Sequence, residues 1–344
     1  MSFGDIKGQE RSTQIIKGYL QSSAFRGAYL FIGEEGIGKY LVARTLAKAI
    51  NCLNRQDDSC DSCASCLKIE KRGHPDIHYI ELTDSDNIKI EAIRSIKKDI
   101  SLKPYEAKSK VFIINDAHNL TAEAAGALLK ILEEPPKNNL IILVSSKPAL
   151  LFKTIISRCK IIRFYPLKRS ELKQMLKKDY SLDDNLAHFL AYFSEGRIGA
   201  ALKLKDADIL KEKNRIIDEF TIPNAAYQRS YASGSRSYTK TDTTFGISGK
   251  SLESSLTQNK ENVRNCLNIL ASWFRDMYLV KIGMSHSELI NLDRKMDLLR
   301  IINRYTMFNL DDTLKSISDS LLYLEQNVNI KLLLSSLKAG LWRG

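Results

Sequence analysis

This sequence lacks any apolar run long enough to cross a bilayer. A membrane-spanning helix needs roughly 20 consecutive apolar residues, and no uninterrupted run of that length occurs. The opening residues, MSFGDIKGQE, also lack the basic and apolar regions of a secretory signal peptide. We therefore expect a cytoplasmic protein with no membrane partner.

Acidic residues are fewer than basic ones. The chain has 40 Asp and Glu against 52 Lys and Arg, a formal net charge of +12 and an isoelectric point near 9.3. This charge favours nucleic acid or acidic protein surfaces as partners, and it equally fits a solvated basic surface. With 344 residues, 44% of them hydrophobic, the chain is long enough for two or three domains with their own cores.

A glycine-rich loop, GEEGIGKY from Gly33 to Tyr40, lacks one residue of a phosphate-binding P-loop. In such a loop the backbone N–H groups around the glycines, here Gly33, Gly36 and Gly38, wrap the phosphates. Lys39 would reach the outer phosphates, and a Ser or Thr should follow to hold Mg²⁺. Tyr40 stands there instead. The loop predicts weak binding of ATP or ADP at most, with impaired hydrolysis.

The surrounding pattern predicts a P-loop domain of the α/β class with a parallel sheet. An apolar run at 28–32 leads into the glycine loop, and helical spacing follows at 40–50. Two later apolar runs, 111–114 and 140–144, have the composition of buried parallel strands. The stretches between them carry the periodicity of crossover helices.

Beyond residue 168 the strand signals fade and helical patterns replace them. Three short amphipathic segments, at 171–178, 185–193 and 199–204, predict a small helical lid. From residue 263 to the end, apolar residues recur with heptad-like spacing, which predicts a helical bundle.

A segment at about 221–260 differs from its surroundings. It is rich in Ser and Thr and poor in large aliphatic residues, so it buries too little apolar surface to offset the entropy of ordering. We interpret it as a linker or disordered insertion. It contains FGISGKS, ending at Ser251, but Thr244 stands where the first glycine of a P-loop belongs and no strand precedes it. That match is a chance one.

The predicted strand at 111–114 is followed by a second modified motif. In P-loop machines the corresponding strand ends in acidic residues, one for Mg²⁺ and the next to polarise the attacking water. Here Asn115 carries no charge, and Asp116 is one methylene shorter than the usual Glu. An alternative interpretation, which this segment leaves open, is that Asn115 to His118 only turns the chain.

Four cysteines have the spacing of a zinc site. The pattern C-x7-C-x2-C-x2-C lets four thiolates surround one tetrahedral ion, formed by Cys52, Cys60, Cys63 and Cys66. Disulfides are the rival interpretation, but a cytoplasmic chain rarely keeps them. Four sulfur ligands leave no open position, so the zinc would be structural. His74 and His78 are not needed as ligands, and Cys159 and Cys266 are isolated small apolar residues.

Two further segments are more distinctive than the glycine-rich loop. They are LLKILEEPP at 128–136 and SRC at 157–159. With them the chain resembles the delta prime subunits of the bacterial DNA polymerase III clamp loader, which are AAA+ proteins. The resemblance covers about residues 1–210 and 262–342. Its other matching segments are GHPDIHYI from Gly73, KVFIINDAHNLT from Lys110, AGALLKILEEPP from Ala125, TIISRC from Thr154, SWFRD from Ser272 and NVNIKLLL from Asn327.

The resemblance implies a role for Arg158. In that family the arginine of SRC projects across a subunit interface toward ATP bound by the adjacent motor subunit, and Arg158 matches it. Such an arginine finger neutralises charge that develops on the transferred phosphoryl group. We expect Arg158 to act in trans, on a neighbour's ATP.

The resemblance also implies a missing lid arginine. Active relatives place an arginine in a G-x-x-R-type turn, where this chain has Gly196, Arg197, Ile198 and Gly199. The expected position holds Gly199. Arg197 is nearby and could substitute for the lid arginine, but two residues away on a helix it would face elsewhere. With Tyr40, Asn115 and Asp116, this makes four departures from an active ATPase, so we expect little or no intrinsic hydrolysis.

The implied domain order is an AAA+ domain at 1–166 with a zinc module at about 52–66, a helical lid at 167–210, a linker at 211–262 and a C-terminal collar at 263–344. The implied partners are the gamma/tau motor subunits and the delta subunit in a hetero-oligomeric ring of the DNA polymerase III holoenzyme. Through that ring the chain would help to load the sliding clamp onto primed DNA. The alternatives are a gamma/tau-like motor that hydrolyses ATP, or a zinc-bearing DNA-binding module outside the ring.

Overall fold

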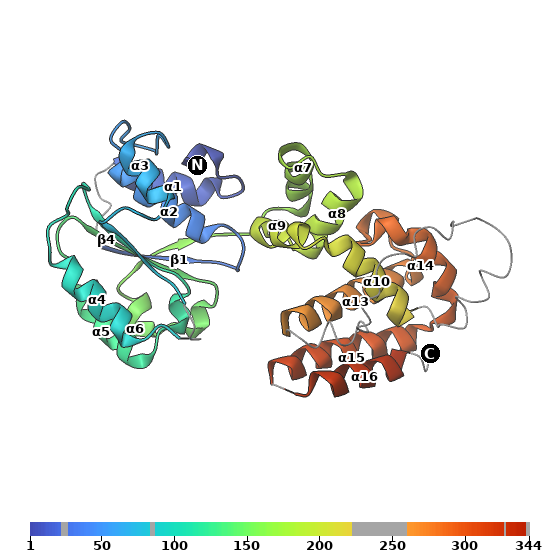
Figure 1. The fold of residues 1–344 in the computed structure, drawn as a ribbon. Coiled ribbons are helices and arrows are strands. Elements are labelled where there is room, and N and C mark those ends of the chain that lie inside the picture. The colour runs from blue at the N-terminus through green and yellow to red at the C-terminus, as the bar shows by residue number, and fades with distance from the viewer. Residues whose placement is uncertain (22–26, 83–86, 222–259, 327, 342–344) are drawn as a thin grey trace, which may run out of the picture. The chain divides into compact units, whose positions relative to one another are not determined.

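The structure is a computed structural model that describes residues 1–21, 27–82, 87–221, 260–326 and 328–341. Nearly all of the segment predicted as a linker or disordered insertion, at 221–260, lies outside these residues, as does the FGISGKS match. The chain divides into two compact units (Figure 1). The first unit contains Met1–Leu172 with Ser194–Leu202, and the second contains Lys173–Phe193 with Lys203–Gly344.

A five-stranded parallel sheet in the order β2-β3-β4-β1-β5 forms the centre of the first unit. The strands are β1 (Gly27–Ile32), β2 (Ile77–Ile80), β3 (Lys110–Ile114), β4 (Asn139–Ser145) and β5 (Lys160–Arg163). The three predicted strands are confirmed as β1, β3 and β4, and so is the α/β fold class. The prediction missed the two edge strands, because β2 and β5 have only four residues each and β5 is exposed at three of them.

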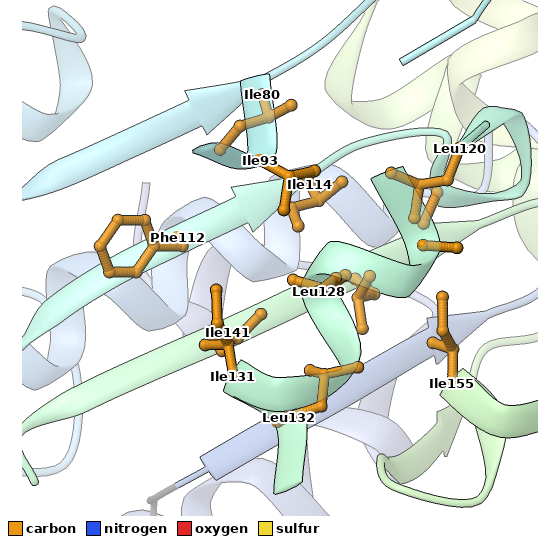
Figure 2. Close-up of a cluster of buried hydrophobic side chains, with 14 of the residues drawn as sticks. Ile80, Ile93, Phe112, Ile114, Leu120, Leu128, Ile131, Leu132, Ile141 and Ile155 are labelled. Atoms are coloured by element: carbon orange, nitrogen blue, oxygen red, sulfur yellow. The ribbon is translucent and has the colours of Figure 1, made fainter. Parts of the chain in front are cut away.

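Helices cover both faces of this sheet. They are α1 (Glu10–Gln21), α2 (Lys39–Asn51), α3 (Ala64–Glu70), α4 (Ile90–Ile100), α5 (Ala122–Glu133) and α6 (Lys153–Ile156). Alternate residues of each strand enter opposite cores: Phe112 and Ile114 pack with α4, α5 and α6, and Val111 and Ile113 pack with α1 and α2. Figure 2 shows the first of these cores, where Leu128 and Ile131 of α5 lie over Ile141 of β4.

The predicted lid helices are confirmed as α7 (Arg169–Asp179), α8 (Asp184–Phe193) and α9 (Ile198–Asp206). Further along, the second unit is all-helical, with α10 (Ile209–Thr221), α13 (Lys260–Lys281), α14 (Lys295–Ile301), α15 (Met307–Glu325) and α16 (Ile330–Leu341). Trp273 and Phe274 of α13 are fully buried. This confirms the predicted C-terminal helical bundle.

Part of the stretch predicted as a linker, residues 211–221, is helical and belongs to α10. Its apolar face is buried through Ile216, Ile217 and Phe220. The fully buried ammonium of Lys213 lies 2.6 Å from the carboxylate of Asp293. These contacts anchor α10 within the second unit. Residues 211–221 are therefore part of the helical core of that unit.

None of the helices in the described part of the chain is long and apolar enough to span a membrane.

Candidate functional site

The P-loop, Gly33 to Tyr40, joins the end of β1 to the start of α2, as its sequence predicted. Gly33, Gly36 and Gly38 have φ angles of 151°, 78° and 98°, in the region that favours glycine. A side chain at Gly33 would also place its Cβ 2.6 Å from the carbonyl oxygen of Phe164. The glycines therefore fix a tight loop at the N-terminus of α2, the usual location of a phosphate site.

The ammonium of Lys39 is held inside its own loop. Its Nζ donates to the carbonyl oxygens of Gly33 and Glu34, at 2.7 and 2.5 Å. Burial lowers the pKa of Lys39 to about 8, although Asp116, Glu35 and Glu34 lie near enough to favour its charged form. A phosphate entering the loop would have to attract this ammonium away from two backbone acceptors.

The side chain of Tyr40 packs against neighbouring aromatic and charged groups. Its ring lies beside Tyr79 of β2, and the guanidinium carbon of Arg72 lies 5.5 and 5.3 Å from the two ring centroids. Arg72 also forms two hydrogen bonds to the carboxylate of Glu81, at 2.9 and 3.2 Å. Burial, and then the Glu81 carboxylate, raises the pKa of Tyr40. The side chain thus belongs to an aromatic and ionic cluster.

Polar side chains meet at the carboxyl ends of β3 and β4, where ligands bind in parallel sheets. Asn115 donates from Nδ2 to Oδ2 of Asp116 at 2.9 Å. His118 follows, and its Nδ1 lies 3.4 Å from Oγ of the buried Ser145. Burial lowers the pKa of His118. Sequence reasoning missed Ser145, although its place at the end of a predicted strand next to β3 could have indicated it.

The start of α9 lies directly against the P-loop. The backbone N–H of Gly199 donates to the carbonyl oxygen of Gly36 at 2.7 Å. A Cβ added to Gly199 would lie 2.8 Å from that same oxygen, and one added to Gly36 would lie 3.0 Å from the nitrogen of Ala200. Position 199 therefore has no room for any side chain in this arrangement.

Arg197 does not face away, contrary to the expectation. Its Nε donates to the carbonyl oxygen of Ser194 at 2.9 Å and lies 3.8 Å from a carboxylate oxygen of Glu34 in the P-loop. The reason is that α9 begins at Ile198, so Arg197 precedes the helix and the helical-face argument does not apply to it. Arg197 thus pairs with the P-loop itself.

Arg158 lies just beyond α6 and is held by its own chain. Its Nε and Nη2 donate to Oε1 of Glu133, at 2.9 and 2.6 Å, and its Nη1 donates to the carbonyl oxygen of Thr154 at 2.9 Å. The side chain remains 33% exposed. Within the described residues, no hydrogen bond or ion pair joins Arg158 to the P-loop. The guanidinium is thus held by Glu133 and Thr154 of its own chain.

The four predicted cysteine ligands come together. The sulfur atoms of Cys52, Cys60, Cys63 and Cys66 lie within 4.8 Å of one another, and all six cysteines of the chain are free thiols. Backbone N–H groups point at two of the sulfurs, Cys63 N at Cys60 Sγ (3.3 Å) and Cys66 N at Cys63 Sγ (3.5 Å). Such N–H donors stabilise thiolates.

The pKa shifts of these cysteines run in opposite directions. Hydrogen bonds from Ser62, and then from the backbone of Cys63, lower the pKa of Cys60 to about 5. Burial raises the pKa of Cys66 to about 12, so its thiolate needs a positive charge beside it. The donor set and its burial therefore fit a metal ion of the zinc type.

The two nearby histidines are engaged elsewhere. His74 accepts from the backbone N–H of Asp76 at 3.2 Å and lies 3.7 Å from Glu106. His78 stacks on Phe112 at 4.6 Å between ring centroids.

A buried lysine that sequence reasoning missed joins α2 to the cysteine module. Nζ of Lys48, 1% exposed, donates to Asp61 at 2.5 Å, to Glu70 at 2.9 Å and to the carbonyl oxygen of Met1 at 2.9 Å. The signal that could have found it is its place on the apolar face of a predicted helix.

Relatives of known identity match this chain. It is 31% identical to DNA polymerase III subunit delta' of Bacillus subtilis over 215 residues, 62% of this chain and 64% of the relative. It is 30% identical to DNA polymerase III subunit tau of the same organism over 291 residues, 81% of this chain and 50% of the relative. The chain thus spans about half to two thirds of the length of these curated relatives.

The solved structures that match this chain have low overall structural similarity to it. A DNA polymerase III gamma-subunit-related protein of Thermotoga maritima has a TM-score of 0.43 at 18% identity, over 95% of this chain and 97% of that chain. The DNA clamp loader delta protein of Bacillus subtilis has a TM-score of 0.34 at 12% identity, over 96% of this chain and 100% of that chain.

Two family models match the chain in succession. The model described as DNA polymerase III, delta subunit matches residues 8–168, and the model described as DNA polymerase III, delta subunit, C terminal matches residues 245–337. Together they match well over half of the chain, so it belongs to the DNA polymerase III delta-subunit family that these models describe.

Proposed function

We propose that this chain is a delta-prime-type subunit of the DNA polymerase III clamp loader, which assists ATP hydrolysis by a neighbouring subunit and hydrolyses little or no ATP itself. The observation that carries this proposal is the placement of Arg158. Its guanidinium is partly exposed at the end of α6 and makes no hydrogen bond or ion pair with the P-loop of its own chain, as far as the described residues go.

The chain's own phosphate site supports the same proposal. Tyr40 replaces the magnesium-binding hydroxyl and packs with Arg72 and Tyr79, and Asn115 carries no charge for a metal. Gly199 leaves no space for a lid arginine. The loop backbone and Lys39 can still meet a phosphate, but the groups that would hold Mg²⁺ and polarise water are altered.

Arg158 would act on ATP bound to a gamma/tau motor subunit. A guanidinium that reaches the transferred phosphoryl group neutralises charge developing in the transition state. It also makes hydrolysis depend on assembly, because the donor and the nucleotide lie on different subunits. Through its C-terminal helices the chain would assemble with the motor subunits and the delta subunit. The assembled ring would then open the sliding clamp and place it on primed DNA. The net charge of +12 suits sequence-independent, salt-sensitive contact with a phosphate backbone.

Zinc would have a structural role. The four cysteine thiolates would hold it with no open coordination position, which excludes a catalytic water at the metal. When bound, it would contribute binding free energy to the folding of the module between α2 and α3. Lys48, through Asp61 and Glu70, joins this module to α2.

Two observations favour a second candidate, a gamma/tau-like motor that hydrolyses ATP. The match to the tau subunit extends over 81% of this chain, and the P-loop glycines and Lys39 are intact.

A third candidate, a zinc-bearing DNA-binding protein outside the ring, predicts strong DNA affinity without partner subunits. Copurification with motor and delta subunits would contradict it.

ATP turnover by the purified chain distinguishes the first two candidates. We expect no turnover at motor-like rates from the wild-type chain, and little gain in the double variant Tyr40→Thr/Asn115→Asp, because Gly199 still closes the lid side of the site. A purified motor subunit assayed alone is the positive control. Motor-like turnover by the wild-type chain alone would contradict the proposal.

A further inference from the structure

We propose that Glu133 is a positioning residue for Arg158, which sets the direction of the guanidinium before a neighbour's phosphate arrives. This inference rests on the proposed function, because it assigns a role to the carboxylate that holds the same arginine. Glu133 is the last residue of α5, within the LLKILEEPP segment, and Arg158 follows α6 within SRC. The pair thus joins the two most distinctive segments of the chain.

The contact occupies one edge of the guanidinium. Nε and Nη2 both donate to Oε1 of Glu133 (2.9 and 2.6 Å), and Nη1 is held at the carbonyl oxygen of Thr154 (2.9 Å) and near Oγ of Ser157 (3.4 Å). A guanidinium has five N–H donors in a planar fork. Four contacts leave at least one donor, on Nη2, for a further acceptor. The side chain is therefore fixed in direction while part of the fork stays available.

Both residues are carried by parts of the same rigid core. Leu132, next to Glu133, is 4% exposed, and Ile155 of α6 is fully buried in the same cluster (Figure 2). Close-packed interiors deform little, so the separation of the two backbones is set by packing and not by the ion pair. The carboxylate thus has a fixed place from which to orient the longer, more flexible arginine.

Exposure argues against a purely stabilising role. Arg158 is 33% exposed and Glu133 48% exposed, and surface ion pairs of this kind contribute little to the stability of the fold. A catalytic group, in contrast, loses a large factor in rate when it is displaced by about 1 Å. Orientation of Arg158 is therefore the larger effect that this contact can have.

An opposite account is that Glu133 withholds Arg158 from a neighbour's phosphate. A carboxylate competes with phosphate for the same donors and offsets the positive charge of the arginine. Removal of Glu133 would then raise ATP turnover by the complex. The two accounts therefore predict changes of opposite sign.

The test is ATP turnover by the reconstituted complex at saturating ATP and DNA. For Glu133→Ala we expect kcat to fall by about 10- to 100-fold with a smaller change in KM. Glu133→Gln keeps an acceptor oxygen at the same reach, and we expect it to stay within about threefold of wild type. Glu134→Ala, which removes the neighbouring exposed carboxylate, is the matched control and should leave turnover unchanged. Unchanged or raised kcat in Glu133→Ala would overturn the inference.

Arg158→Ala separates this inference from the proposed function. If Arg158→Ala leaves turnover of the complex unchanged, the proposed function fails. If Arg158→Ala abolishes turnover and Glu133→Ala does not lower it, only the positioning role fails.

A second measurement needs no partner subunits. In the purified full-length chain, the Nε–H signal of Arg158, identified by its loss in Arg158→Lys, should be protected from exchange with water in wild type and Glu133→Gln. It should exchange faster in Glu133→Ala, because the acceptor is gone. Equal exchange in all three proteins would overturn the inference even if a variant failed to assemble.

Discussion

Gly199 shows at the scale of one residue how closely the start of α9 packs against the P-loop. Its N–H bonds to Gly36 in the P-loop, and its missing side chain lets the two backbones approach. A substitution that restored an arginine here would first have to move the start of α9. The packing of this unit therefore excludes a longer side chain at position 199.

Gly199→Ala should destabilise the sheet-containing unit. The added Cβ would lie 2.8 Å from the carbonyl oxygen of Gly36, and overpacking against backbone costs about 1–3 kcal/mol. Calorimetric unfolding, and amide exchange at residue 199, would measure the loss of stability. Gly126→Ala is the control, because its Cβ meets nothing within 4 Å in the middle of α5 and alanine favours a helix. Equal stability of the two variants would contradict the close approach.

Lys39 gives a prediction for pH dependence. Burial lowers its folded-state pKa to about 8, against about 10.4 in an unfolded chain. Between these values the unfolded state binds more protons, so this residue adds stability as pH rises. The free energy of unfolding of wild type minus that of Lys39→Met should therefore increase from about pH 8 to about pH 10.4. Denaturant titrations at several pH values would measure it, and a flat or falling difference would contradict the shift.

The cysteine module is the element whose stability depends most directly on a ligand. Its helix α3 has only seven residues, which is too short to be stable alone. Four converging sulfurs and the contacts of Lys48 hold it to α2. A metal ion would therefore act on this element as a crosslink.

Metal analysis of protein prepared without added metal should find about one zinc per chain. Removal by a chelator should lower the unfolding temperature of the sheet-containing unit, because metal-binding free energy is lost from the folded state. Cys63→Ser should lose the metal, and Cys266→Ala, which changes a cysteine outside the cluster, should keep it. Far less than one zinc per chain, with disulfides among the four cysteines, would contradict the zinc site.

Elements with continuous apolar runs could be predicted from the sequence, and those defined by tertiary contact could not. Strands β3 and β4 are buried along their whole length, so their composition alone indicates them. Strand β5, with charged ends and one buried position, exists because it pairs with β1. Helix α10 gives no sign in the sequence that the buried Lys213 has an acidic partner 80 residues away.

The residues of the candidate site also fall into two groups, those that the sequence predicts and those that only the folded structure brings together. The P-loop and the cysteine cluster follow from spacing within short segments, so sequence reasoning identified their residues. The pairing of Arg158 with Glu133, and of Arg197 with Glu34, joins residues far apart in the chain. Such pairs become visible only after folding.

On the scale of the whole molecule, the chain's own nucleotide site and the surface arginine Arg158 are explained by the same proposed function. The chain keeps the P-loop glycines and Lys39, and in the proposed function Tyr40, Asn115 and Gly199 replace residues that hydrolysis requires. Arg158 is meanwhile held at the surface, outside that loop. We therefore infer a subunit whose catalytic contribution exists only in an assembly.

ATP turnover by the reconstituted complex with Arg158→Ala is the most direct test of this account. Arginine fingers contribute about 10³- to 10⁵-fold to kcat, so turnover at the site that faces this subunit should fall by about that factor while the complex still assembles. Arg163→Ala, in β5 near SRC but outside it, should leave turnover unchanged. Of these two variants, we expect only Arg158→Ala to lose turnover. Full turnover by a correctly assembled Arg158→Ala complex would show that Arg158 does not act on a neighbour's ATP.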